Sequence, residues 1–353
     1  MGKKYVAYVG TYTHGTSKGI QVYDVNLEEG TLTERSEVEV SNASYTAVSK
    51  NGKYLYSIED EGVAVFKRDH NGDLARINSV DIDGMRGCFL ATDVDGKYLY
   101  VAGYHDGKVT VVHTHKDGRL GSVMDGVFHT GLGSVAERNF RPHVNCVNIT
   151  PDQKYLCAVD LGVDQVKIYK FNDETGKITL VDMLRCELES APRIIKFSPD
   201  GRFAYLICEL KNYISVYSYK DGPRGPVFEL VQTISTLNEY HSKGSAACVL
   251  RFSRDWNYVL CSNAGDNSVG IFKIDRETGM LEKICILPVS GDYPKAADFF
   301  PDNRHIMSLN HETNTMTIFK INYEKKYFSM WGKPLKVETP NCILVSEIEK
   351  LPG

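Results

Sequence analysis

The stretch SPDGRFAYLICEL, residues 198–210, carries the pattern that decides the fold: a polar turn with Asp-Gly, a basic residue and then an apolar strand. Five further copies occur along the chain, namely SKNGKYLYSIED (49–60), VDGKYLYVAGY (94–104), TPDQKYLCAVDLG (150–162), SRDWNYVLCSNAG (253–265) and FPDNRHIMSLNHE (300–312). Asn-Gly and Asp-Gly turns beside alternating apolar strands are typical of β-hairpins. The sequence therefore predicts a repeated β unit.

The repeat has the period of a propeller blade. Its turn Asp or Asn falls at positions 51, 95, 152, 200, 255 and 302, at intervals of 44, 57, 48, 55 and 47 residues, and blades repeat about every 40–50 residues. The N-terminal GKKYVAYVGTY, from Gly2, and the C-terminal NCILVSEI, from Asn341, each match part of the unit. Six full copies and one split copy predict an all-β, seven-bladed β-propeller of four-stranded antiparallel blades. We expect the N- and C-terminal strands to pair in one blade and close a single domain of residues 1–353.

Composition and charge exclude several classes of partner. The chain has 353 residues, a formal net charge of -4 and a pI of about 6.2, which gives no basic surface for nucleic acid or an anionic membrane. No apolar run is long enough to span a membrane, and the N-terminus lacks the apolar segment of a signal peptide. The nine cysteines form no CxxC pair and lie mostly in predicted strands. We therefore expect a cytoplasmic protein with reduced thiols and no nucleic-acid or membrane partner.

Antiparallel pairing also predicts where a site forms. The start of each first strand lies beside the end of its second strand, and first strands line the channel of a propeller, so these ends meet at one mouth. Charges set in apolar sequence stand out there: Arg193 in SAPRIIKFS, Glu209 in YLICEL and His143 before VNCVNI. Such a charge either pairs with another or acts on a ligand. The other rim residues that we expect to bind substrate are Tyr12, Asn42, Tyr104, Asn145, Asn263, Lys295 and Asn310.

Two other patterns indicate structure rather than chemistry. Asp160 begins DLGVD, which is typical of a turn whose carboxylate binds backbone N–H groups. His113 and His115 have metal-ligand spacing, but they end a predicted strand at the opposite face with no third ligand nearby. We therefore expect a surface pair and no metal. No GxSxG elbow exists, which argues against an α/β-hydrolase serine mechanism.

Several stretches resemble the seven-bladed lactonase family, which includes propeller-type 6-phosphogluconolactonases and fungal carboxymuconate lactonising enzymes. They span essentially the whole chain: YVGTYT (8–13), NASY (42–45), PHVN (142–145), VDLGVDQV (159–166), APRIIKFSPDGRFAY (191–205), CEL (208–210), CSNAGDNSVGIF (261–272) and PNCILV (340–345). The resemblance implies that His143, Arg193 and Glu209 are the catalytic groups. Three positions depart from the family pattern: Asn145 stands where a second His is common, Ala264 where SNRG has its Arg, and Lys295 where an Arg is common.

The resemblance implies a lactonase of the pentose phosphate pathway, with a small sugar lactone as its partner and 6-phospho-D-glucono-1,5-lactone as the first substrate to try. Ring opening needs a base for the attacking water, either Glu209 or His143, and a cation for the developing oxyanion, Arg193. It needs no cofactor. Without the SNRG arginine, phosphate binding falls to Arg141, Arg251 or Lys295. Two alternatives stay open: a lactonase or lactonising cycloisomerase for an unphosphorylated lactone, and a non-catalytic binding module.

Overall fold

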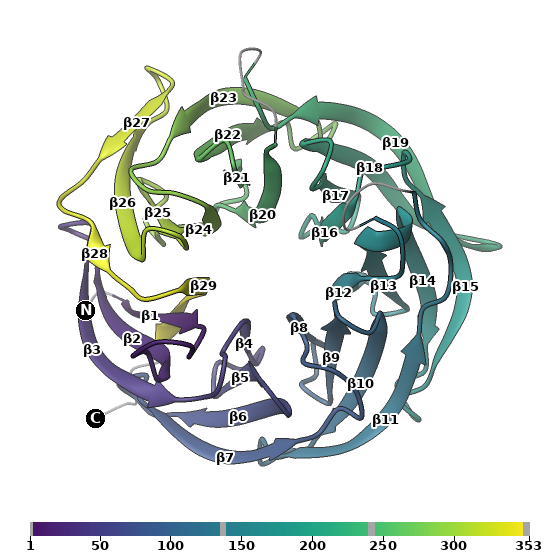
Figure 1. Cartoon of the computed structure of the whole chain (residues 1–353). Helices are drawn as coiled ribbons and strands as arrows, with labels where there is room; N and C mark the ends of the chain where they lie inside the picture. The colour runs from purple at the N-terminus through teal and green to yellow at the C-terminus, as the bar shows by residue number, and fades with distance from the viewer. Residues whose placement is uncertain (1–2, 135–138, 239–243, 349–353) are drawn as a thin grey trace. The chain divides into compact units, whose positions relative to one another are not determined.

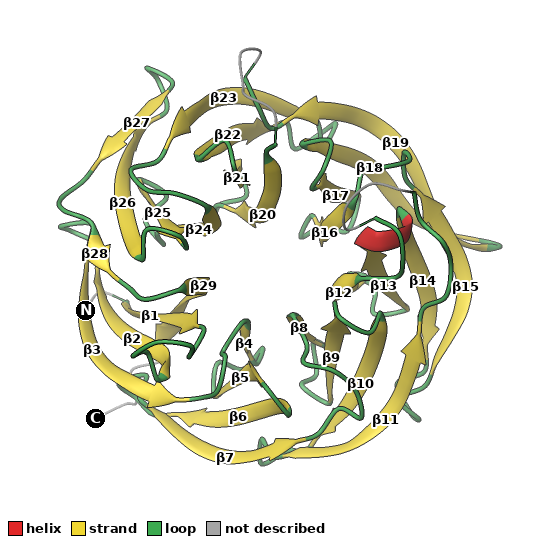
Figure 2. Cartoon of the chain, viewed as in Figure 1, coloured by secondary structure: helices red, strands yellow, loops and turns green. Residues whose placement is uncertain are grey.

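The computed structural model describes residues 3–134, 139–238 and 244–348. Nearly all secondary structure in these ranges is β-strand, apart from a short 3-10 helix, η1 (Leu161–Val163) (Figure 2). The strands form seven antiparallel sheets, which confirms the predicted count of blades. Within the described ranges, no helix has both the length and the apolar character needed to cross a membrane.

Contacts between residues divide the chain into two units. The first comprises residues 1–46, 68–74 and 234–353 and contains three sheets (Figure 1). In spatial order these are β29 (Pro340–Ile348), β1 (Lys4–Thr11), β2 (Gly19–Asn26) and β3 (Thr31–Glu39); β20 (Ala246–Phe252), β21 (Tyr258–Ala264), β22 (Ser268–Ile274) and β23 (Leu281–Pro288); and β24 (Pro294–Phe299), β25 (His305–Asn310), β26 (Thr315–Asn322) and β27 (Tyr327–Met330), with β28 (Leu335–Lys336) also paired to β26.

The second unit comprises residues 47–67 and 75–233 and contains most of the other four sheets. They are β4 (Thr46–Val48), β5 (Tyr54–Glu59), β6 (Gly62–Arg68) and β7 (Leu74–Val80); β8 (Phe89–Thr92), β9 (Tyr98–Gly103), β10 (Lys108–Thr114) and β11 (Leu120–Phe128); β12 (Val144–Ile149), β13 (Tyr155–Asp160), β14 (Gln165–Phe171) and β15 (Ile178–Arg185); and β16 (Pro192–Phe197), β17 (Phe203–Cys208), β18 (Tyr213–Gly222) and β19 (Gly225–Ser235). Within this unit the first strands are neighbours, because β12 contacts both β8 and β16 (Figure 1).

The predicted split blade is confirmed. Strand β29 pairs antiparallel with β1, so the first and last parts of the repeat share one sheet. The Tyr8 hydroxyl donates to the Gly72 carbonyl oxygen at 2.6 Å, and Arg68 Nε donates to the same hydroxyl oxygen at 2.9 Å. All of these contacts lie inside the first unit, where they tie the 68–74 turn to the split sheet.

The strands of a sheet differ in burial, and this difference places the site. Every residue of the second strands β9, β13 and β17 is buried, whereas most of the fourth strand β15 is partly or fully exposed. A strand that is buried on both faces needs cover from both sides, and the neighbouring sheets supply it. Polar groups at the ends of the first and second strands therefore adjoin an apolar interior. There they must find a partner or face a ligand.

In the first unit, two hydrophobic clusters pack on the sheet β24–β27. One joins it to the split sheet and includes Ala7, Phe300 and Met307. The other joins it to the sheet β20–β23 and includes Leu260 and Phe299. Each sheet is thus held by side chains from its neighbour, as expected of blades that cannot bury both faces alone.

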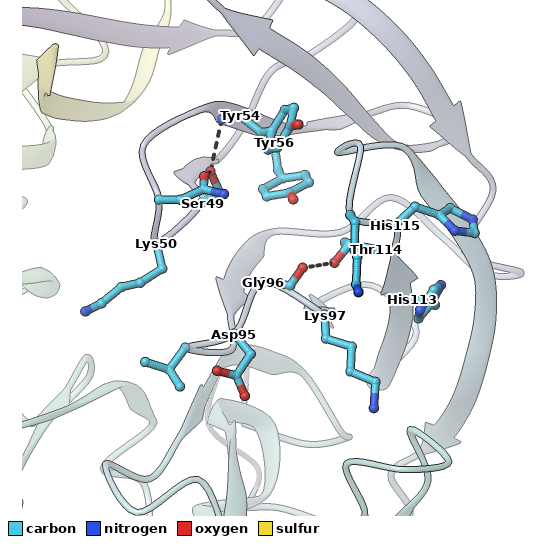
Figure 3. Close-up of a pocket in the computed structure, with 13 residues that line it drawn as sticks. Ser49, Lys50, Tyr54, Tyr56, Asp95, Gly96, Lys97, His113, Thr114 and His115 are labelled. Atoms are coloured by element: carbon cyan, nitrogen blue, oxygen red, sulfur yellow. Dashed lines mark hydrogen bonds between the residues drawn. The ribbon is translucent and has the colours of Figure 1, made fainter. Parts of the chain in front are cut away.

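The recurring Asp or Asn of each copy has a structural reason in the turn between the first two strands. In SKNGKY the Ser49 hydroxyl donates to Asn51 Oδ1 at 2.8 Å and accepts from the Tyr54 N–H at 3.0 Å (Figure 3). Ser198 and Asp200 repeat the first of these contacts at 2.6 Å. The short polar side chains satisfy backbone donors that the hairpin leaves open, which explains why the turn chemistry repeats along the chain.

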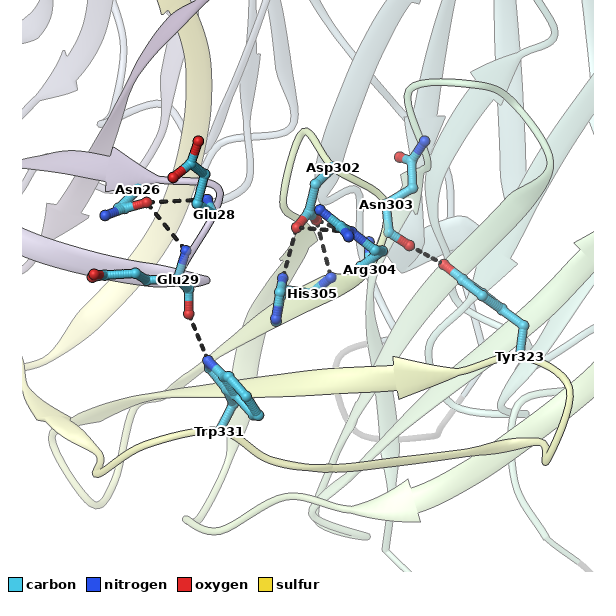
Figure 4. Close-up of polar contacts among 9 residues, drawn as sticks. All are labelled: Asn26, Glu28, Glu29, Asp302, Asn303, Arg304, His305, Tyr323 and Trp331. Carbon is cyan, nitrogen blue, oxygen red and sulfur yellow. Dashed lines mark hydrogen bonds and ion pairs between the residues drawn. The ribbon is translucent and has the colours of Figure 1, made fainter. Parts of the chain in front are cut away.

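In the copy FPDNRH, a histidine side chain contributes to the hydrogen bonds of the same turn. The Asp302 carboxylate accepts from His305 Nδ1 at 2.7 Å and from the Arg304 N–H at 2.8 Å (Figure 4). Nearby, Trp331 Nε1 donates to the Glu29 carbonyl oxygen at 2.7 Å. This indole bond fixes the segment after β27 to the turn between β2 and β3.

Candidate active site

A β-bulge starts the first strand of several sheets. At the same position in five sheets a register shift leaves one residue without a paired partner across the ladder: Asn145, Arg193, Cys248, Lys295 and Asn341. Bulges turn a side chain out of the regular alternation and are frequent next to active sites. Three of the five are predicted site residues. Sequence reasoning missed Cys248 and Asn341, although Asn341 follows Pro340 as Arg193 follows Pro192, and this shared proline was a usable signal.

In the second unit the structure brings Arg193 and Glu209 together. Pro192 pairs with Cys208 across β16 and β17, so the bulged Arg193 lies beside the residue that follows β17. Arg193 Nη1 forms an ion pair with Glu209 Oε2; the two side chains are 19% and 1% exposed. The Arg193 carbonyl oxygen also accepts from Asn145 Nδ2 of the neighbouring bulge at 3.3 Å. The arginine therefore reaches solvent while its partner carboxylate does not.

His143 is held in one tautomer. Its Nδ1 lies 2.6 Å from the Tyr104 carbonyl oxygen, and because a carbonyl only accepts, Nδ1 carries the proton and donates it. The Tyr104 ring stacks on the imidazole, with centroids 4.3 Å apart and an interplanar angle of 18°. Among the described residues, Nε2 has no hydrogen-bond partner. Tyr104 thus orients the His143 imidazole so that its Nε2 is left to act as a base.

Asp160 holds the backbone of His143 in place by a hydrogen bond. Its carboxylate accepts from the backbone N–H of His143 at 2.8 Å and of Gly162 at 3.0 Å, which confirms the interpretation of DLGVD as a structural turn. His129 Nδ1 lies 2.7 Å from the other carboxylate oxygen, and both of these side chains are fully buried. Burial lowers the pKa of His129, against the opposing effect of Asp160, so this imidazole is neutral near pH 7. Sequence reasoning missed His129, and no local pattern around it signals the contact.

In the first unit Tyr12 and Lys295 meet. Lys295 Nζ donates to the Tyr12 hydroxyl at 3.2 Å and lies 4.7 Å from the ring centroid. His311 contacts the same ring edge-on at 5.8 Å, and its Nδ1 lies 3.0 Å from the Pro340 carbonyl oxygen. Burial lowers the pKa of His311. This cluster places an imidazole and a lysine side chain around one aromatic ring.

The three predicted asparagines of the first unit have buried side chains that hold loops. Asn42, at a φ of 48°, accepts from the Thr13 N–H at 2.9 Å through Oδ1. Asn263 Nδ2 donates to the Thr236 carbonyl oxygen at 2.8 Å. Asn310 Nδ2 lies 3.2 Å from two threonine hydroxyls. Contact of these three with substrate stays a prediction.

Comparison with known proteins bears on this geometry. A family model described as lactonase, 7-bladed beta-propeller, matches residues 6–345, and the seven-bladed β-propeller is the fold of this chain. The 6-phosphogluconolactonase of Bacillus subtilis (strain 168) is 31% identical over 346 residues, which cover 96% of this chain and 98% of that protein. Two solved structures are also similar. The periplasmic gluconolactonase of Pseudomonas aeruginosa has a TM-score of 0.91 at 26% identity, and a protein from Lactobacillus plantarum has 0.88 at 28%; each comparison covers 98% of this chain and 100% of the other.

Proposed function

The chain belongs to the lactonase family of seven-bladed β-propellers, and from that membership we propose that it is a cytoplasmic hydrolase that opens a sugar lactone. The substrate that we propose is 6-phospho-D-glucono-1,5-lactone, which is converted to 6-phosphogluconate. The observation that carries the proposal is that the contacting strands β12 and β16 of the second unit carry two candidate catalytic groups at their starts. Arg193 reaches solvent and is fixed by a buried carboxylate, and the Nε2 of His143 has no hydrogen-bond partner among the described residues.

In this mechanism His143 Nε2 takes a proton from the attacking water while the water oxygen bonds to the lactone carbonyl carbon. The Arg193 guanidinium stabilises the negative charge that develops on the carbonyl oxygen. Protonated His143 then returns the proton to the ring oxygen as the ester bond breaks. Glu209 is the positioning residue for Arg193, because its carboxylate is buried and engaged by the guanidinium, which makes it a poorer base than the imidazole. The reaction needs no cofactor.

The phosphate requires a cation, and of the three that the sequence offers only Arg141 lies in the same unit as His143 and Arg193. Ala264, which stands where the SNRG motif has its arginine, is fully buried and supplies no charge to a phosphate. Lys295 is engaged by Tyr12, and Arg251 Nε lies 3.6 Å from an Asp298 carboxylate oxygen. Arg141 remains, two residues from His143 and exposed.

Contacts of Arg141 support this role. Among the described residues, its guanidinium hydrogen-bonds only the His105 carbonyl oxygen, at 3.0 Å. Burial, and then the charges of Arg86, His143 and Arg141, lower the pKa of His105. Although burial is the main cause and the Asp106 carboxylate opposes the shift, the Arg86 and Arg141 guanidinium groups bring positive charge near this imidazole, as a dianionic phosphate would require. We therefore assign phosphate recognition to Arg141.

The first experiment is a panel of lactones assayed by proton release, corrected for spontaneous hydrolysis. We expect saturable turnover of 6-phospho-D-glucono-1,5-lactone, with a lower kcat/KM for D-glucono-1,5-lactone. The reverse order would favour the second candidate, a lactonase for unphosphorylated sugars, which Ala264 and the likeness to the Pseudomonas aeruginosa gluconolactonase support. If the folded protein turned over none of the lactones, the remaining hypothesis would be a non-catalytic binding module.

Replacing Arg141 with Gln should change substrate preference. A charge-assisted hydrogen bond contributes about 1.5–3 kcal/mol, so kcat/KM on the phosphorylated lactone should fall about 10- to 100-fold. The value for D-glucono-1,5-lactone should stay nearly constant. Arg119→Gln is the matched control, because Arg119 is an exposed arginine of the same unit paired with Asp117. An unchanged ratio of the two kcat/KM values would remove Arg141 from phosphate recognition.

A further inference from the structure

The second unit contains a pocket of about 720 Å³ that the proposed reaction does not use (Figure 3). It lies between the β4–β5 turn, the β8–β9 turn and the end of β10. It is lined by Ser49, Lys50, Asn51, Tyr54, Tyr56, Val94, Asp95, Gly96, Lys97, His113, Thr114, His115 and Lys116. Pockets of about 300–1,000 Å³ hold small molecules. Tyr104 follows the far end of β9, so the length of that strand, roughly 20 Å, separates the pocket from the candidate active site.

Charge distinguishes this pocket from its surroundings. Its lining has three lysines and one carboxylate, although the whole chain has a net charge of -4. An adjoining pocket of about 560 Å³ in the same unit has the opposite lining, with Asp93, Asp95, Asp152, Asp173 and Asp221 against Lys154 and Lys170. Positive charge is therefore concentrated in the first pocket and is no general property of this face.

Two histidines form part of one wall of the pocket. The rings of His113 and His115 meet edge to face, with centroids 4.8 Å apart. His113 Nδ1 and His115 Nε2 both lie about 3 Å from the point where a side chain at Gly121 would begin, so these two nitrogens face β11, whose Gly121 does not line the pocket. Burial, and then His115 and Lys97, lower the pKa of His113, which is consistent with a positive environment. The surrounding ammonium groups oppose a bound metal ion and favour an anion.

The lysines differ in how they are held. Lys97 donates to the Asp173 carbonyl oxygen and lies 5.2 Å from the Tyr98 ring centroid, which anchors its charge at the pocket wall. Lys50 and Lys116 are exposed, and neither has a salt-bridge partner among the described residues. Such groups can close on a ligand without breaking an existing ion pair.

We propose that this pocket binds a small phosphorylated molecule with at least two phosphate groups. Three ammonium groups match the charge and the many acceptor oxygens of such a ligand. The pocket is large enough to hold a sugar or another small body beside the phosphates. The proposal does not depend on lactone hydrolysis, since it uses none of the residues assigned to that reaction.

Calorimetric titration of the full chain with pyrophosphate tests the proposal. We expect one site per chain, with affinity that falls as salt rises, and at least a tenfold increase in Kd for the double variant Lys50→Ala/Lys116→Ala. Lys53→Ala is the matched control, because Lys53 is an exposed lysine of the same turn that does not line the pocket. It should bind like the wild type.

The variant Arg141→Gln tests whether pyrophosphate binds at the candidate active site instead of the basic pocket. Loss of pyrophosphate binding in Arg141→Gln, with normal binding in the lysine double variant, would place the anion at the candidate active site and overturn the proposal. Equal losses in the double variant and in Lys53→Ala would indicate a diffuse surface effect and overturn it too. No measurable heat at millimolar pyrophosphate would have the same consequence.

Discussion

Arg193→Ala is expected to lower kcat on the lactone substrate by about 10²–10³-fold, the scale for losing one oxyanion contact. Arg193→Lys should recover only part of the rate, because a point charge does not reproduce the guanidinium fork that Glu209 holds. The measurement is kcat on folded protein, with Tm recorded on the same preparations. Because Glu209 is 1% exposed, Arg193→Ala also leaves a buried carboxylate without its partner and should destabilise the fold by about 3–5 kcal/mol.

This destabilisation requires a second variant that stays folded. Arg193→Gln/Glu209→Gln removes both charges and keeps hydrogen-bonding groups at the two positions, so its Tm should lie closer to the wild type than that of Arg193→Ala. Its kcat should nevertheless be as low as in Arg193→Ala. If Arg193 and Glu209 only hold two strands together, the double variant will turn over lactone at nearly the wild-type rate, and the oxyanion role is lost.

His143→Asn should lower kcat by about 10²–10⁴-fold, the usual range for removing a general base. The asparagine amide can still donate to the Tyr104 carbonyl oxygen in place of Nδ1, but it has no basic nitrogen where Nε2 stood. The loss should therefore be catalytic, with Tm little changed, as measured on the same preparations.

The matched control for this variant is His70→Asn, an exposed histidine of the first unit that lies outside both the candidate active site and the basic pocket. It should keep the wild-type kcat. Turnover near the wild-type level in a folded His143→Asn protein would remove the imidazole as the base. Glu209 would then be the remaining candidate, and Glu209→Gln would have to abolish the rate.

The fold was predictable because its chemistry is local and repeated. Asp200 and its counterparts each organise a turn within a few residues, so a single phrase could be counted along the chain. The Arg193–Glu209 pair was predictable for a related reason: antiparallel pairing of consecutive strands puts the start of one beside the end of the next. His129 was not predictable, because its contact with Asp160 joins two segments that no strand ladder connects.

Burial explains the other differences. Asn263 and Asn310 stand at strand ends, where the sequence predicts exposed polar groups, but both are buried. Asn263 Nδ2 donates to the Thr236 carbonyl oxygen in the loop after β19, and Asn310 Nδ2 donates to the Thr315 hydroxyl at the start of β26. The β-bulge at Arg193 was also hidden, since Ile194 and Ile195 after it are both apolar and buried, so the sequence has no alternation there that an inserted residue would visibly break. The basic pocket depends on side chains from two sheets, and periodicity along one strand carries no information about their meeting.

The pairing of β29 with β1 sets a condition on synthesis. Lys3 and Glu347, which form an ion pair across this sheet, are 344 positions apart. At a synthesis rate of ~5–20 residues per second, β29 leaves the ribosome on the order of 20–70 s after β1. Throughout that interval one edge of β1 presents unpaired N–H and C=O groups beside apolar side chains, which is a template for pairing with another nascent chain. The cell must keep neighbouring nascent chains away from this edge until the last blade is complete.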